Sequence, residues 1–195
     1  MRQWRIVIAV VAMAIGLSAR GLEFSGEAAD PATAASTTVV DASFNDRDVL
    51  YSQLMLVHSR QAVTLANLAL SADTDASGSV KLVATRIKVD HASEIERMTL
   101  LLRAWDEPLA LPPNPEPLQL QTGILTVKHV DYITSLRGAA FDLEYLESMI
   151  SHHEGSIDMA RREIIKGQNV SLLELAKAVV TKRQSSIDEM NALLN

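Results

Sequence analysis

The chain has 195 residues, of which 48% are hydrophobic and 22% are charged, and it contains no cysteine. This length and composition suit one globular domain with a sizeable core rather than a disordered chain. The formal net charge of −6 argues against a nucleic-acid partner, because binding to phosphate backbones depends on Lys and Arg. Aromatic residues make up only 4% of the chain whereas aliphatic residues are plentiful, which favours an all-α fold.

The first 41 residues are predicted to be a signal peptide followed by a tether. Arg2 and Arg5 precede an uninterrupted apolar run over 6–17, which is typical of a secretion signal. This run is shorter than the roughly 20 residues that span a bilayer, so cleavage is favoured. An uncleaved signal would instead tether the chain to a membrane. In either case we expect a location outside the cytoplasm, in the cell envelope or in the medium.

Start and stop signals predict four long helices in the rest of the chain. They are expected over residues 45–70, 79–105, 139–166 and 171–195. The first begins with Asn45 and Asp48, a pattern close to a capping box. The third ends at Gly167, a residue type that often follows the end of a helix. Ser171 and Glu174 form a capping-box pattern that predicts the start of the fourth.

The helices are expected to form two hairpins. Residues 44–106 make the first hairpin and 139–195 the second, with a proline-rich crossover over 107–138 between them. The crossover leaves room for a short extra helix at 123–137. Because neither hairpin can bury its apolar stripe alone, the two should pack face to face as a four-helix bundle over 43–195.

The two hairpins are copies of one pattern. At an offset of 94 residues, one copy aligns with the other at Asp48, Tyr51, Met55, His58 and Ala66, which match Asp142, Tyr145, Met149, His152 and Ala160. The match continues further along at an offset of 92. Matches at spacings of three, four and seven are expected when the inward face of a helix is duplicated. The sequence therefore predicts a bundle with a pseudo-two-fold axis.

The copies begin with FNDRDVLYSQLMLVHSRQAVTLA and FDLEYLESMISHHEGSIDMAR. Both stretches resemble the paired signature of the domain-of-unknown-function 305 family. The resemblance implies an exported bacterial protein with a ferritin-like helical bundle, and some members of the family are associated with copper handling. Members typically carry Met-Met-x-x-His-His in each copy. The second copy keeps Met149, His152 and His153, whereas the first has His58 followed by Ser59.

Seven side chains are candidate metal ligands. They are Met55, His58, His91, Met149, His152, His153 and Met159. Met55 shares a helix face with His58, and Met149 shares one with His152, so these four should meet near the pseudo-two-fold axis. His91 lies on the apolar stripe of the second helix, level with His58. Thioether sulfur selects copper, so mixed Met and His ligands predict a copper site, with copper(I) as the best fit.

The same residues also have structural interpretations. Met at helical spacing usually fills a core, and an inward His is usually hydrogen-bonded to a neighbour. His153 and Glu154 are then expected at a solvated edge, and Tyr51 and Tyr145 are expected to pack with their hydroxyls at the rim of the bundle. Arg183, the repeat partner of His91, is expected to pair with an acidic residue. The candidates are Glu154, Asp142 and Glu147.

Two functions remain open on these grounds. The first is an exported protein that sequesters or delivers copper, with the metal ion as its partner. The second is an interaction or structural module of the envelope that holds no metal; a homodimer is compatible with either. An enzyme is not expected, because the chain lacks the Glu-x-x-His of di-iron bundles and any thiol. Ile157 also stands where the zinc-protease motif needs a second His.

Overall fold

The computed structural model describes residues 43–111 and 123–195. The predicted signal peptide and tether lie outside the described residues, as does the middle of the crossover. Every regular element in the described ranges is helical. The prediction of an all-α helical bundle is therefore confirmed.

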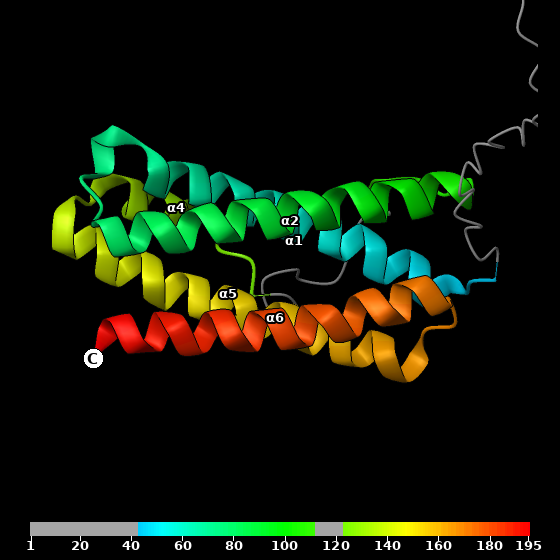
Figure 1. Cartoon of the computed structure of the whole chain (residues 1–195). Helices are drawn as coiled ribbons and strands as arrows, with labels where there is room; N and C mark the ends of the chain where they lie inside the picture. The colour runs from blue at the N-terminus through cyan, green and yellow to red at the C-terminus, as the bar shows by residue number, and fades with distance from the viewer. Residues whose placement is uncertain (1–42, 112–122) are drawn as a thin grey trace, which may run out of the picture. The chain divides into compact units, whose positions relative to one another are not determined.

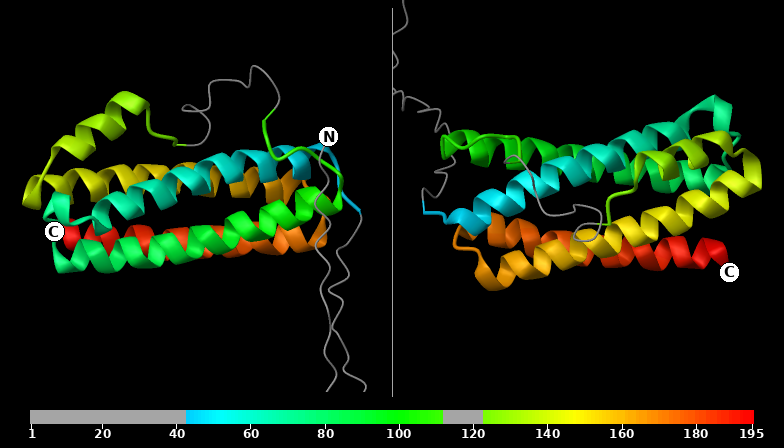
Figure 2. Two further views of the ribbon diagram at one scale, coloured as in Figure 1. Left: turned by 90° about the horizontal axis from the view of Figure 1, so that it is seen from above. Right: turned by 180° about the vertical axis from the view of Figure 1, so that it is seen from behind.

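Four long helices form the bundle (Figure 1). They are α1 (Asp46–Leu70), α2 (Gly78–Ala104), α5 (Gly138–Lys166) and α6 (Val170–Leu194). A short 3-10 helix, η1 (Ala72–Thr74), lies in the first loop, and α4 (Val127–Ser135) lies in the crossover. Seen from above, α1 and α5 form one layer and α2 and α6 the other, with α4 on the outer side of the first layer (Figure 2). The two hairpins thus pack face to face, as the duplicated pattern predicts.

Side-chain caps fix where the helices begin. Asn45 accepts hydrogen bonds from the N–H groups of Arg47 and Asp48, while Asp48 accepts one from the N–H of Asn45, so the predicted capping box is present. The capping box predicted at Ser171 is wrong. Helix α6 is capped by Asn169 instead, whose side chain accepts from the N–H of Leu172 at 2.9 Å. Asn is as good a cap as Ser, and the backbone N–H of Asn169 is bonded by a residue outside the helix.

The acceptor of this hydrogen bond is Asp48, which links the two hairpins. The carboxylate of Asp48 accepts hydrogen bonds from the N–H groups of Gln168 and Asn169, both at 3.0 Å, in the loop between α5 and α6. Its repeat partner Asp142 accepts one from the N–H of Ser77 at 3.1 Å, in the loop between α1 and α2. Each hairpin therefore caps the loop of the other, which gives the repeated Asp a structural role.

Helix α5 ends at Gly167 as predicted, but for a different reason. The φ of Gly167 is −73°, so the left-handed conformation that usually favours glycine is not used here. A Cβ atom on Gly167 would collide with the carboxyl group of Glu163. The glycine leaves room for a buried acidic side chain that folds back over the end of its own helix.

The core consists of two apolar clusters, one towards each end of the bundle. Cluster A contains Leu65, Tyr145 and Met149, and cluster B contains Tyr51, Met55 and Met159, each with further aliphatic residues. Repeat partners fall in opposite clusters, since Met55 is in B and Met149 is in A. This is the arrangement that a pseudo-two-fold axis across the middle of the bundle requires.

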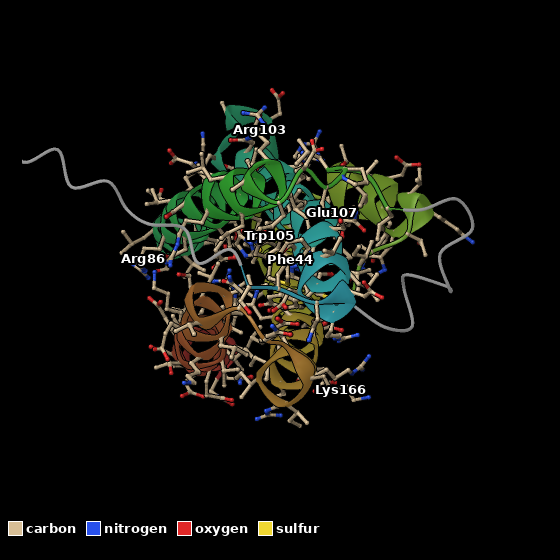
Figure 3. All side chains as sticks on the ribbon, turned by 90° about the vertical axis from the view of Figure 1, so that its right-hand side faces the viewer. Phe44, Arg86, Arg103, Trp105, Glu107 and Lys166 are labelled. Atoms are coloured by element: carbon tan, nitrogen blue, oxygen red, sulfur yellow. The ribbon has the colours of Figure 1, made fainter. Side chains whose placement is uncertain are left out.

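An aromatic stack lies at the end of cluster B. The rings of Phe44 and Trp105 stack with centroids 4.7 Å apart. Figure 3, which looks down the bundle from this end, shows the pair near the centre and Arg86 on the side where α2 faces α6. Within the described ranges, no helix is both long enough and apolar enough to cross a membrane.

Candidate metal centre

A layer of buried polar side chains separates the two apolar clusters. On α1, α2 and α6 these residues fall between the positions that belong to cluster A and those that belong to cluster B. On α5 they lie between Met149 of cluster A and Met159 of cluster B, with Ile157 of cluster A next to them. We call them the histidine layer: His58, Ser59, His91, Glu94, His152, His153, Ser156 and Arg183. None is more than 5% exposed. The layer therefore lies at the level of the pseudo-two-fold axis.

Four imidazole rings meet in this layer. The centroids of His58 and His152, which are repeat partners, lie 3.7 Å apart. His91 lies 5.9 Å from His58 and 5.6 Å from His153. The structure thus brings together all four candidate histidines, including His91 at the height expected from the hairpin loop.

The predicted exposure of His153 is wrong. Its side chain is fully buried, whereas Glu154 is exposed as expected. The prediction from a single apolar stripe assumes that other helices cover α5 on one side only. In the structure α5 packs against α1, α4 and α6. It therefore buries a wider arc than one stripe, and that arc includes the side chain 100° away from His152.

The prediction that the hydroxyls of Tyr51 and Tyr145 lie at the rim of the bundle is also wrong. Tyr51 and Tyr145 are fully buried, and neither hydroxyl has a hydrogen-bond partner among the described residues. Burial raises the pKa of both phenols far above the ordinary value. Both rings therefore fill the clusters beside the histidine layer, and neither hydroxyl reaches the rim.

Arg183 pairs with a residue that the sequence did not single out. Its Nη2 donates to the carboxylate of Glu94 at 2.6 Å. The three predicted partners are elsewhere: Glu147 and Glu154 are exposed, and Asp142 is bound to the loop of the other hairpin. Glu94 was missed because its repeat partner is Ser186, so the duplication gives no signal for it. The available signal was its position one turn after His91 on the same helix.

Hydrogen bonds assign the ring protons of two histidines. Nε2 of His58 lies 2.9 Å from the backbone oxygen of His152, so Nε2 carries the proton and Nδ1 has a free lone pair. Nδ1 of His91 lies 3.3 Å from Nη2 of Arg183, which can only donate, so Nδ1 accepts and Nε2 is protonated. In this state Nε2 of His91 has no hydrogen-bond partner, but it carries a proton and therefore cannot bind a metal.

Burial keeps the imidazoles neutral. It lowers the pKa of His58 to about 3, an effect that the hydrogen bond to the backbone of His152 partly opposes and the charge of Arg183 adds to. Burial also lowers the pKa of His91, His152 and His153 well below the ordinary range, with the Arg183 charge as a further cause for each. The neutral ring is the form that binds metals. Burial raises the pKa of Glu94, while the Arg183 guanidinium opposes that rise.

Comparison with known proteins places the chain. The family model for DUF305, a domain of unknown function, matches residues 48–194. The chain belongs to the DUF305 family. No curated protein matches the sequence significantly.

Solved structures of similar fold include other DUF305 proteins. A DUF305 fragment from Deinococcus radiodurans is 24% identical with a TM-score of 0.69, and the match covers 77% of this chain and 96% of that one. A candidate secreted DUF305 protein from Streptomyces coelicolor is 26% identical with a TM-score of 0.69, over 76% and 90% of the two chains. The Cu(I)-bound form of CopM is 21% identical with a TM-score of 0.60, over 75% and 94%. CopM has also been solved in Cu(II)-bound and silver-bound forms.

The three candidate methionines of this DUF305 chain do not form one group. Met55 and Met159 lie in cluster B and Met149 in cluster A, all almost fully buried. Met55 and Met149 each precede a histidine of the layer by one helical turn, so thioethers border the layer on both sides. Among the described residues, no three His, Asp or Glu side chains are arranged so that they could hold an ion. Binding in the layer would therefore require the rings to rotate.

Proposed function

We propose that this DUF305 protein binds copper(I) in its histidine layer and sequesters or delivers the ion outside the cytoplasm. The observation that carries the proposal is a set of six buried ring nitrogens without a hydrogen-bond partner in the described structure. They are Nδ1 of His58, Nε2 of His91, and both ring nitrogens of His152 and His153. Buried polar groups are normally paired, and each unpaired one costs about 1–3 kcal/mol. Three of these nitrogens, one each in His58, His152 and His153, have a lone pair when the rings are neutral, and a metal ion would bind them at once.

The chemistry of the layer supports a soft ion of low charge. Neutral imidazoles bordered by thioethers suit copper(I), whereas hard ions prefer carboxylate and water oxygens. The only carboxylate in the layer, Glu94, is already paired with Arg183. The buried guanidinium also repels a second positive charge, and this repulsion is weaker for a monovalent than for a divalent ion. CopM, which has a similar fold, was solved with Cu(I) and with silver, which supports a soft monovalent ion, and it was also solved with Cu(II).

Three histidines are proposed as the first ligands. Nδ1 of His58 already presents a lone pair, and each ring of His152 and His153 has one nitrogen that can do so. His91 would join when Arg183 releases its Nδ1. Met55 and Met149, one turn away, are the thioethers closest in sequence. The N-terminal signal pattern and the candidate secreted relative support a location outside the cytoplasm, and we propose a binding role rather than catalysis.

A competition titration tests this proposal. Copper(I) is partitioned between the protein and a chromophoric chelator, and the affinity of the wild type is compared with that of a His58→Ala, His152→Ala double variant. We expect the double variant to bind at least about tenfold more weakly, a loss of roughly 1.4 kcal/mol or more. The control is His129→Ala, because His129 lies in α4 outside the layer and bonds to Ser148 and Glu144. Equal affinity for wild type and double variant would refute the proposal.

The metal-free structural module remains the second candidate. Its supporting observation is that part of the layer is satisfied without an ion, through the Arg183–Glu94 pair and the hydrogen bond from His58 to the backbone of His152. Thermal unfolding separates the two functions. A bound ion at 100 times its Kd adds about 2.7 kcal/mol of stability, which raises the Tm by several degrees. An unchanged Tm in saturating copper(I) would favour the structural module.

A further inference from the structure

The histidine layer is enclosed by the bundle, but a groove in the described part of the chain reaches it. This groove runs between α2 and α6 and has a volume of about 270 Å³. Its walls carry Arg86, Asp90, Lys182 and Glu189 from the two helices, and its lining includes His153 and Arg183 from the layer. His153 itself is fully buried. The groove therefore meets the layer at His153, one of the two imidazoles whose ring nitrogens both lack a partner in the described structure.

The walls of the groove are joined by exposed ion pairs. Nζ of Lys182 lies 2.7 Å from the carboxylate of Asp90, and Arg86 pairs with Glu189. Arg86 and Glu189 are each more than two-fifths exposed. Exposed pairs of this kind contribute little stability, typically about 0–1 kcal/mol. They can therefore open and close without unfolding the bundle.

Two other hollows on the described part of the bundle stop short of the layer. The hollow under the crossover is lined by Gly123, Ser148 and Ser151, among others, and by no residue of the histidine layer. The hollow between α5 and α6 is lined by side chains that include Glu154 and Gln184, and it likewise touches none of the layer. The crossover side is the closer competitor, because Ser151 directly precedes His152.

We propose that copper(I) enters and leaves the histidine layer through the α2–α6 groove, and that His153 is the first side chain to bind the entering ion. This inference rests on the proposed function of the layer. The step is a ligand exchange: the ion loses bound water and accepts a lone pair from a ring nitrogen of His153, with no change of oxidation state. Arg183 stands between the groove and His91, since it lines the groove and bonds to Nδ1 of His91. Its displacement frees that nitrogen and passes the ion inward.

A plug in the groove tests this route. Ser186, which lines the groove and is half-buried, is changed to Phe in the full chain. The protein is loaded with copper(I) and mixed with an excess of bathocuproine disulfonate, under conditions where the release rate no longer depends on the chelator concentration. We expect release from Ser186→Phe to be about tenfold slower or more at an unchanged Kd, because a plug slows entry and exit equally. Ser185→Phe, at an exposed position of the same groove, is the second variant if the first folds poorly.

The matched control is Ser151→Phe, which places the same ring in the hollow under the crossover. We expect it to release copper at the wild-type rate. Slow release from Ser151→Phe with normal release from the groove variants would overturn the proposal in favour of the crossover side. Wild-type rates in all variants would overturn it as well. A wild-type protein that binds no copper(I) would instead reject the function of the layer, so the two failures are distinguishable.

Discussion

Each histidine of the layer couples folding to pH. In the folded chain burial lowers the pKa of all four, that of His58 to about 3. In the unfolded chain the same rings have an ordinary pKa of about 6.5. Below that pH the unfolded chain binds more protons than the folded one. Stability from these groups is therefore complete above about pH 6.5 and is lost as the pH falls below that value.

A single histidine can test this coupling. We expect His153→Gln to show a shallower loss of unfolding free energy between pH 6.5 and 4.5 than the wild type. The difference in slope should approach about 1.4 kcal/mol per pH unit, the value for one proton. Urea unfolding of metal-free protein at several pH values measures it. A wild-type slope in His153→Gln would mean that His153 is not held neutral in the folded chain.

Glu163 couples folding to pH in the opposite direction. Burial, reinforced by the neighbouring Asp48, raises its pKa to about 8, while Arg47 opposes the rise. The folded chain thus keeps a proton that the unfolded chain loses above about pH 4.5. The associated stability is complete below that pH and is lost as the pH rises through about 8.

Glu163→Gln should remove this loss, because the amide stays neutral at every pH. We expect the variant to be more stable than the wild type at pH 9 by more than about 1 kcal/mol, and much closer to it at pH 5. Urea unfolding at the two pH values gives the comparison. Glu147→Gln is the control, since Glu147 is an exposed acid on the same helix. A pH-independent difference between Glu163→Gln and wild type would show that Glu163 titrates normally.

The sequence predicted the centre of the site better than its surroundings. His58 and His152 could be placed together because they are repeat partners, and His91 because helical height follows from the loop position. Glu94 could not be found in that way, since the second copy has Ser186 at its position. The depth of His153 depends on how many helices surround α5, which is a property of the assembled bundle.

At the scale of helices, the two hairpins are linked through their ends. Asp48 lies in the first turn of α1 and Asp142 in the second turn of α5. Each accepts hydrogen bonds from backbone N–H groups in the loop of the opposite hairpin. Helix boundaries themselves were accurate to a residue or so, because caps and glycine are local signals. The cap of α6 was predicted wrongly, because the position of Asn169 depends on its hydrogen bond to Asp48, 121 residues away.

Removing one of these links should weaken the whole bundle. We expect Asp48→Ala to lower the free energy of unfolding by about 2–3 kcal/mol, because it leaves N–H groups at two helix starts, including the buried one of Asn169, without their acceptor. Chemical denaturation measures the change. Asp46→Ala, an exposed acid in the same helical turn, should cost well under half as much. Similar losses for the two variants would contradict a linking role for Asp48.

For the molecule as a whole, the pseudo-two-fold axis organises both stability and function. It places an apolar cluster on each side and leaves the unequal parts of the duplication at the centre. His153 matches Ser59, and Arg183 matches His91. The second hairpin thus supplies His152 and His153, two of the three histidines proposed to bind the ion. It also supplies Arg183, whose positive charge opposes binding of a cation. A soft monovalent ion is the cargo that fits such a layer.

The most direct test of this account is X-ray absorption spectroscopy at the copper edge on the protein loaded with one equivalent of copper(I). We expect the copper ligands to be mainly nitrogen, with the multiple-scattering features of two or three imidazole rings and no more than one or two sulfur neighbours. The His58→Ala, His152→Ala variant should lose most of those imidazole features. A wild-type shell made of oxygen alone, or one without imidazole scattering, would contradict binding in the histidine layer.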